Sequence, residues 1–134
     1  MKNNKKVIRI AVALTAMLLI VAVGWYFLFP VPVHVSGNGT VIFHYDGIKI
    51  EEPLTEKESG TIANIVNGHS AVFDTPACGF SSKIGIRFSG QMISIACDNC
   101  PTLSVHGMYF DVSKEEAEQF RSIMRAHGAK FPCI

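Results

Sequence analysis

The sequence predicts an α+β protein in which one N-terminal transmembrane helix precedes an antiparallel sheet of about three hairpins, with two amphipathic helices packed on one face. Three observations predict this class: an unbroken apolar run, alternating apolar segments that meet at two-residue glycine turns, and two helix capping boxes. We expect a cytoplasmic basic segment over residues 1–9, a transmembrane signal-anchor over 10–29, a stalk over 30–39 and an extracytoplasmic, disulfide-stapled α+β domain over 40–134.

The apolar run over residues 10–29 is long enough to cross a hydrocarbon core of roughly 30 Å, at about 1.5 Å per helical residue. Four basic residues precede it, namely Lys2, Lys5, Lys6 and Arg9. Because the next charged residue is Asp46, the positive-inside rule places the N-terminus in the cytoplasm and the rest of the chain outside the cell membrane.

A cleavable signal peptide is the alternative interpretation of this run. Residues 22–24, Ala-Val-Gly, resemble a small-residue cleavage site. However, residues 25–29 are aromatic and apolar, and Trp25 and Tyr26 are the residue types that favour a membrane interface. This pattern favours an uncleaved anchor, and both interpretations place the chain after Pro30 outside the cytoplasm.

The part of the chain beyond the anchor is mildly acidic. It carries eight Lys and Arg against eleven Asp and Glu, a net charge of −3. This balance argues against a nucleic-acid partner.

The domain begins with a hairpin after the stalk, where Pro30 and Pro32 favour an extended chain. Residues 41–45 and 48–50 alternate in polarity around Asp46-Gly47, a pair typical of a type I′ turn. Residues 84–88 and 93–95 flank a second turn at 89–90, and residues 103–105 and 108–112 flank a third at 106–107. Between the first and second hairpins, residues 71–73 form a short strand candidate.

Two helices are predicted from their capping boxes. Thr55 and Glu58 open the first, whose apolar residues fall at helical spacing up to Asn67. Ser113 and Glu116 open the second, which ends at Gly128. Its predicted inner stripe is Ala117, Phe120, Ile123, Met124 and His127.

Cysteine provides the most specific chemistry in the sequence. All four cysteines lie beyond the anchor: Cys78, Cys97, Cys100 and Cys133. An even number in an oxidising compartment indicates two structural disulfides. Strand register favours Cys78–Cys100 with Cys97–Cys133, while Cys78–Cys97 with Cys100–Cys133 is almost equal.

Two other interpretations of the cysteines remain open. Cys97 and Cys100 form a Cys-x-x-Cys motif typical of thiol–disulfide oxidoreductases, although no helix is predicted to start at Cys97. The four thiols could also hold zinc, but structural zinc sites usually pair two such motifs. We therefore expect no metal and no cofactor.

The five histidines, His34, His44, His69, His106 and His127, lack metal-ligand spacing, and we interpret them as surface or cap residues. No nucleophile elbow or phosphate-binding glycine loop occurs in the sequence. The leading hypothesis is therefore a membrane-anchored extracytoplasmic binding domain without catalytic activity, whose partner is a protein or an envelope component. The alternatives are a tethered thiol–disulfide oxidoreductase and an accessory subunit whose transmembrane helix is the functional part.

Overall fold

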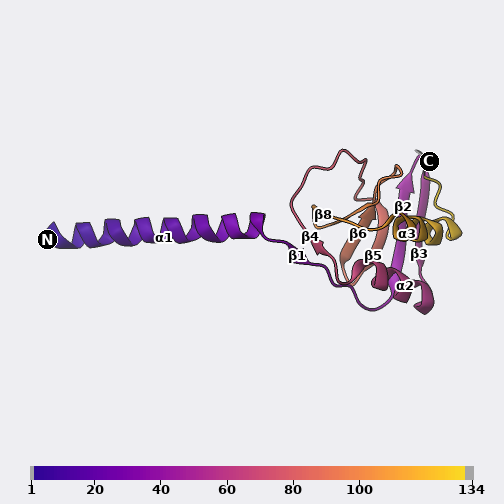
Figure 1. Cartoon of the computed structure of the whole chain (residues 1–134), viewed down its shortest axis with the longest axis horizontal. Coiled ribbons are helices and arrows are strands. Elements are labelled where there is room, and N and C mark those ends of the chain that lie inside the picture. Colours follow the sequence, from indigo (N-terminus) through magenta and orange to yellow (C-terminus); the bar gives the residue numbers. More distant parts are fainter. Residues whose placement is uncertain (1, 132–134) are drawn as a thin grey trace.

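The computed structural model describes the backbone of residues 2–131 and the side chains of residues 5–131. A long helix, α1 (Lys2–Leu28), projects from a compact part that contains the strands and two further helices (Figure 1). Within the described residues, Lys5–Leu28 is the one helix long and apolar enough to cross a membrane, and none of its span is buried against protein. The predicted α+β class, antiparallel sheet and apolar N-terminal helix are confirmed.

Six strands form the main sheet in the order β3-β2-β5-β6-β7-β8, and every neighbouring pair is antiparallel. Their bounds are β2 (Gly39–Tyr45), β3 (Ile48–Pro53), β5 (Ile84–Phe88), β6 (Gln91–Ile95), β7 (Thr102–Val105) and β8 (Met108–Asp111). Across the first two turns, Tyr45 lies opposite Ile48 and Phe88 lies opposite Gln91.

The sharp turns in this sheet require left-handed backbone conformations. Asp46 and Gly47 have φ of 49° and 77°, and His106 and Gly107 have φ of 50° and 75°. Positive φ at both central residues defines the type I′ turn, whose twist matches that of the flanking strands. This geometry explains why a glycine closes each two-residue turn.

One face of the sheet carries the core. Its side chains share one apolar cluster with those of α2 (Glu56–Val66) and α3 (Lys114–Ala126). The largest fully buried members are Phe43, Phe88, Phe120, Ile62, Ile84, Ile86, Ile93, Ile95, Leu103 and Met124. Both predicted capping boxes are present, because Thr55 with Glu58 and Ser113 with Glu116 bond reciprocally to each other's backbone N–H groups.

The residues between α1 and β2 are attached to the domain at several points. Strand β1 (Val31–Pro32) pairs with β4 (Ser70–Ala71) in a separate two-stranded sheet. Val33 and Val35 are buried. The side-chain amide of Asn67 accepts a hydrogen bond from Val35 N at 2.7 Å and donates one to Val35 O at 3.1 Å. These contacts fix the course of residues 31–35 along the domain.

Candidate functional site

The face of the sheet opposite the core, called here the open face, carries a groove of about 350 Å³. Strand register builds its floor, since Ser94 lies opposite Ser104 and Ser104 lies opposite Tyr109. Paired residues project to the same side of a sheet, so these three side chains form one row across β6, β7 and β8. The lining residues are Phe80, Ser81, Ser82, Gly90, Met92, Ser94, Ser104, His106, Gly107 and Tyr109.

The 72–83 segment crosses the open face and forms one wall of the groove. Val72 exchanges two backbone hydrogen bonds with Tyr109, at 2.9 and 2.8 Å, which continues the sheet beyond β8. Further along, the ring of Phe80 lies 5.1 Å from that of Tyr109, centroid to centroid. At its far end, the carbonyl of Lys83 accepts a hydrogen bond from His44 N at 2.9 Å. The segment is thus attached at both ends, with apolar and hydroxyl groups between them.

A disulfide between Cys78 and Cys100 ties the middle of this segment to the loop between β6 and β7, with the two Cα atoms 6.1 Å apart. This is one of the pairings that strand register favoured. Cys97 is half-buried against the core, and its backbone N–H donates to Gly79 O at 2.8 Å. Cys133, the expected partner of Cys97 or Cys100, lies outside the described residues.

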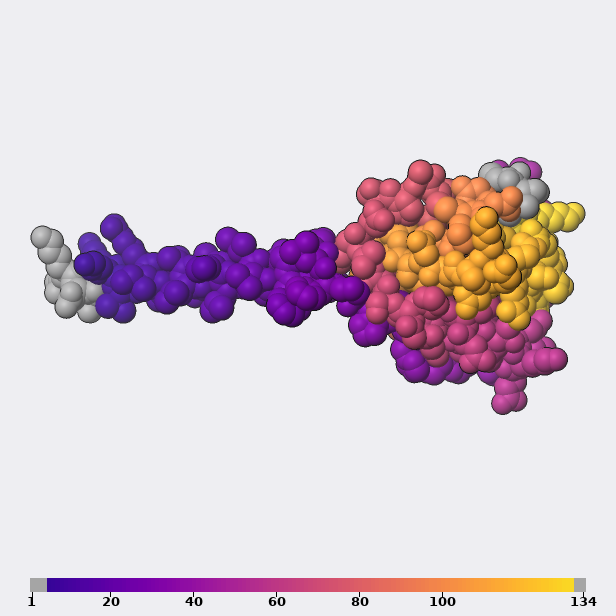
Figure 2. All heavy atoms as spheres, in the orientation of Figure 1, coloured from indigo at the N-terminus to yellow at the C-terminus, as the bar shows by residue number. Residues whose placement is uncertain are grey.

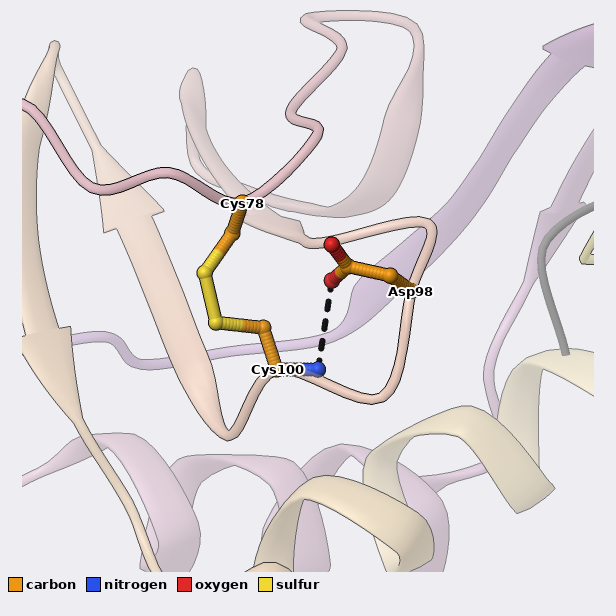
Figure 3. Close-up of side chains that lie close together, drawn as sticks. All are labelled: Cys78, Asp98 and Cys100. Carbon is orange, nitrogen blue, oxygen red and sulfur yellow. Dashed lines mark hydrogen bonds between the residues drawn. A yellow bond between two sulfur atoms is a disulfide. The ribbon is translucent and has the colours of Figure 1, made fainter.

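Asp98 organises the loop beside the disulfide (Figure 3). Its Oδ1 accepts a hydrogen bond from Cys100 N at 3.2 Å, and its Oδ2 accepts one from Gly79 N at 3.5 Å. One carboxylate therefore bonds both chain segments that the disulfide joins. The aspartate inside the Cys-x-x-Cys motif thus has a structural role in this geometry.

Arg121 donates hydrogen bonds to the backbone of the same loop. It lies on α3, is only 2% exposed, and its Nη2 donates to Asp98 O and Cys100 O, both at 2.7 Å. Its Nε is buried without a hydrogen bond within the part of the chain that the structure describes. Burial lowers the pKa of the Arg121 guanidinium, but arginine remains charged in proteins. Both hydrogen bonds are therefore charge-assisted.

Metal chemistry at this loop depends on the state of the cysteines. Cys78, Asp98 and Cys100 each offer a ligand atom within 4.8 Å of the others. Both sulfur atoms are bonded to each other here, so they are not the thiolates that bind zinc. The oxidised site does not fit a thiolate-bound metal.

The thiol–disulfide exchange hypothesis receives no geometric support here. Cys100 is bonded to Cys78, and residues 96–101 are a loop between two strands rather than the start of a helix. The helix dipole that lowers the pKa of a redox cysteine is therefore missing at Cys97. The hypothesis stays an untested prediction.

His127 is the cap residue at the C-terminal end of α3, as expected, and it makes contacts that the sequence did not indicate. Its Nδ1 lies 3.1 Å from Glu52 Oε2, and its Nε2 lies 3.3 Å from Glu58 Oε1. Hydrogen bonds from the Thr55 backbone and hydroxyl, with a smaller contribution from His127, lower the pKa of Glu58. This cluster joins the C-terminal end of α3 to β3 and to the first turn of α2.

Comparison with protein-family models, with curated proteins and with solved structures finds no match to this chain.

Proposed function

We propose that this chain is a single-pass membrane protein, with a cytoplasmic N-terminus and an uncleaved signal-anchor, whose extracytoplasmic domain binds a protein or an envelope component. In this proposal the domain is a sheet of three hairpins with both helices on the core face, which leaves the open face for a partner. The groove, with the tethered 72–83 segment as one wall, is the observation that carries the proposal.

The chemistry of the groove indicates what its partner presents. Serine hydroxyls can donate and accept hydrogen bonds, while Phe80, Met92 and Tyr109 supply apolar and aromatic surface. Among the described residues that line the groove there is no Lys, Arg, Asp or Glu, so the lining offers no fixed charge to a charged group. We therefore expect the partner to insert an uncharged group that combines a flat apolar part with hydrogen-bonding atoms.

The disulfide adds preorganisation to the groove. A flexible wall would lose conformational entropy when a partner binds, and a covalent tie removes part of that cost before binding. The Cys78–Cys100 bond and the Val72–Tyr109 bridge hold the segment that carries Phe80 at two points. A structural disulfide beside a binding groove suits an oxidising compartment better than the cytosol.

Crosslinking in membranes tests this function. The full chain and two variants are expressed, crosslinked in intact membranes and recovered, and the captured species are identified by mass spectrometry. Ser104→Phe fills the floor of the groove, and Ser122→Phe makes the same chemical change at an exposed position on α3. We expect a partner that wild type and Ser122→Phe capture equally and that Ser104→Phe loses.

Capture of the same species by all three chains, or by none of them, would contradict binding through the groove. Far-UV circular dichroism and mapping of the Cys78–Cys100 bond check that each variant is folded. A shorter replacement, Ser104→Val, provides a second groove variant if phenylalanine prevents folding.

A further inference from the structure

The end of α1 contacts the domain through aromatic rings. Phe73, in the 72–83 segment, lies 4.7 Å from Phe27 and 5.5 Å from Tyr26, measured between ring centroids. Figure 2 shows the rose-coloured residues that follow β4 directly against the end of the projecting helix. Phe73 also packs against the domain core, so it joins the helix end to the domain.

Backbone hydrogen bonds also hold the residues that follow α1 against the domain. Only two residues separate Leu28, the last residue of α1, from Val31, where β1 begins. Strand β1 pairs with β4, and Val33 N donates to His69 O at 2.9 Å. Phe73 follows β4 by two residues, so the pairing that holds β1 also sets where Phe73 lies relative to the helix.

The length of the apolar helix then determines the depth of Phe73. The 24-residue span Lys5–Leu28 is about 36 Å long at 1.5 Å per residue, which is more than a hydrocarbon core of about 30 Å. Tyr26 and Phe27 lie in its last turn, at the level where aromatic side chains favour the membrane interface. A ring in contact with both of them lies at the same level.

We propose that residues 72–75 form a second membrane contact, with the Phe73 ring at the lipid interface beside the end of the anchor. The proposal rests on the membrane anchor of the proposed function but not on the groove or its partner. Val72 is 39% exposed and adds apolar surface next to Phe73. Asp74 is exposed and repels anionic headgroups, so the lipid surface that fits this segment is neutral or zwitterionic.

The second contact would hold the domain in one orientation on the bilayer. A single helix followed by a flexible linker would let the domain rotate freely. A second contact beside the helix, at the end of the β1–β4 pair where α1 enters and residue 72 leaves, restricts that rotation. The groove would then open at a fixed angle and a short distance from the membrane, because Tyr109 both lines the groove and bonds to Val72. This geometry suits a partner that is itself held at the membrane.

Tryptophan fluorescence in vesicles tests the depth of residue 73 in the membrane directly. Trp25 is the only tryptophan, so Trp25→Phe gives a silent background for the full chain. Three tryptophans are then placed one at a time: Phe73→Trp in the segment, Phe27→Trp as the membrane reference, and Tyr45→Trp as the aqueous reference at the hairpin turn, where the side chain is 45% exposed. The vesicles are phosphatidylcholine with nitroxide on the acyl chain near the headgroup, and iodide is the aqueous quencher.

We expect Phe73→Trp to resemble Phe27→Trp, with strong quenching by the nitroxide lipid and at least threefold weaker quenching by iodide than Tyr45→Trp. Quenching of Phe73→Trp by iodide to the extent seen for Tyr45→Trp would overturn the proposal. Val72→Trp, in the same segment, serves as a second variant if Phe73→Trp does not fold.

Alkaline carbonate washing of the same vesicles separates the two proposals. Release of the chain by the wash would show that α1 does not anchor it in the membrane. That result would contradict both the second contact and the proposed membrane function. Retention of the chain together with an aqueous Phe73→Trp would overturn the second contact alone.

Discussion

Replacement of Arg121 tests how the loop beside the groove is held. Its guanidinium is nearly fully buried and donates two hydrogen bonds, to the carbonyls of Asp98 and Cys100. Arg121→Met keeps an unbranched apolar stem but removes both donors. The change therefore removes the hydrogen bonds and keeps most of the packing contacts of the side chain.

The expected change in the free energy of unfolding is the balance of two opposing effects. Hydrogen bonds from a charged donor contribute about 1.5–3 kcal/mol each, so the loss of two is worth about 3–6 kcal/mol. Removal of a buried charge recovers part of its desolvation penalty, which offsets some of that loss. We expect Arg121→Met to lower the free energy of unfolding by about 2–4 kcal/mol.

Urea unfolding of the full chain in detergent micelles, followed by near-UV circular dichroism, measures this change. Arg125→Met is the matched control, because Arg125 lies one helical turn further on, has a 36% exposed side chain and pairs with Glu118 at the surface. Such a surface ion pair contributes about 1 kcal/mol at most. Equal effects of the two variants would refute the assigned role of Arg121.

The remaining predictions concern glycine sites, pH and the disulfide. Gly60→Ala should raise the free energy of unfolding by about 0.5–1 kcal/mol, because an added Cβ in this helix interior meets no atom within 4 Å beyond its own stretch of helix backbone. Gly85→Ala should lower it by at least about 2 kcal/mol in the same urea titration, since its Cβ would lie 2.1 Å from a backbone carbonyl oxygen. The lowered pKa of Glu58 stabilises the fold above the usual carboxylate pKa, and this stabilisation is lost as the pH falls through the folded-state pKa. The stability advantage of wild type over Glu58→Gln should therefore shrink as the pH falls below the usual carboxylate pKa, and a constant difference would contradict the pKa assignment. Joint replacement of Cys78 and Cys100 by serine should cost about 3 kcal/mol, as expected for a bond that closes a separation of 22 residues; an unchanged urea midpoint would contradict this.

Local signals in the sequence were sufficient for much of the fold. The turns with positive φ at both central residues and the reciprocal capping boxes are decided within four residues of chain, so residue types alone predict them. Strand register favoured Cys78–Cys100, the bond that the structure contains, but left Cys78–Cys97 almost equal, so the sequence did not decide between them.

Long-range polar contacts were not predictable in this way. Helical spacing puts Arg121 on the inner side of α3 with Ala117 and Met124, but an arginine is usually assigned to the surface because of its charge. Its carbonyl partners, 23 and 21 residues away, are not visible from the sequence. Asn67 was expected only as a helix end, whereas its amide bonds Val35, 32 residues earlier. To predict the groove, one must know both the row of paired residues and the course of the 72–83 segment. The sequence of that segment has no periodic pattern from which its course could be predicted.

The location of the domain on the non-reducing side of a membrane is the claim on which the proposed function depends. Its most direct test is to block thiols with N-ethylmaleimide in intact cells that express the full chain, and then to map its peptides without reductant. We expect the peptides containing Cys78 and Cys100 to be recovered as one linked pair, with the label on neither of these two cysteines. Recovery of both cysteines as separate, labelled peptides would contradict it.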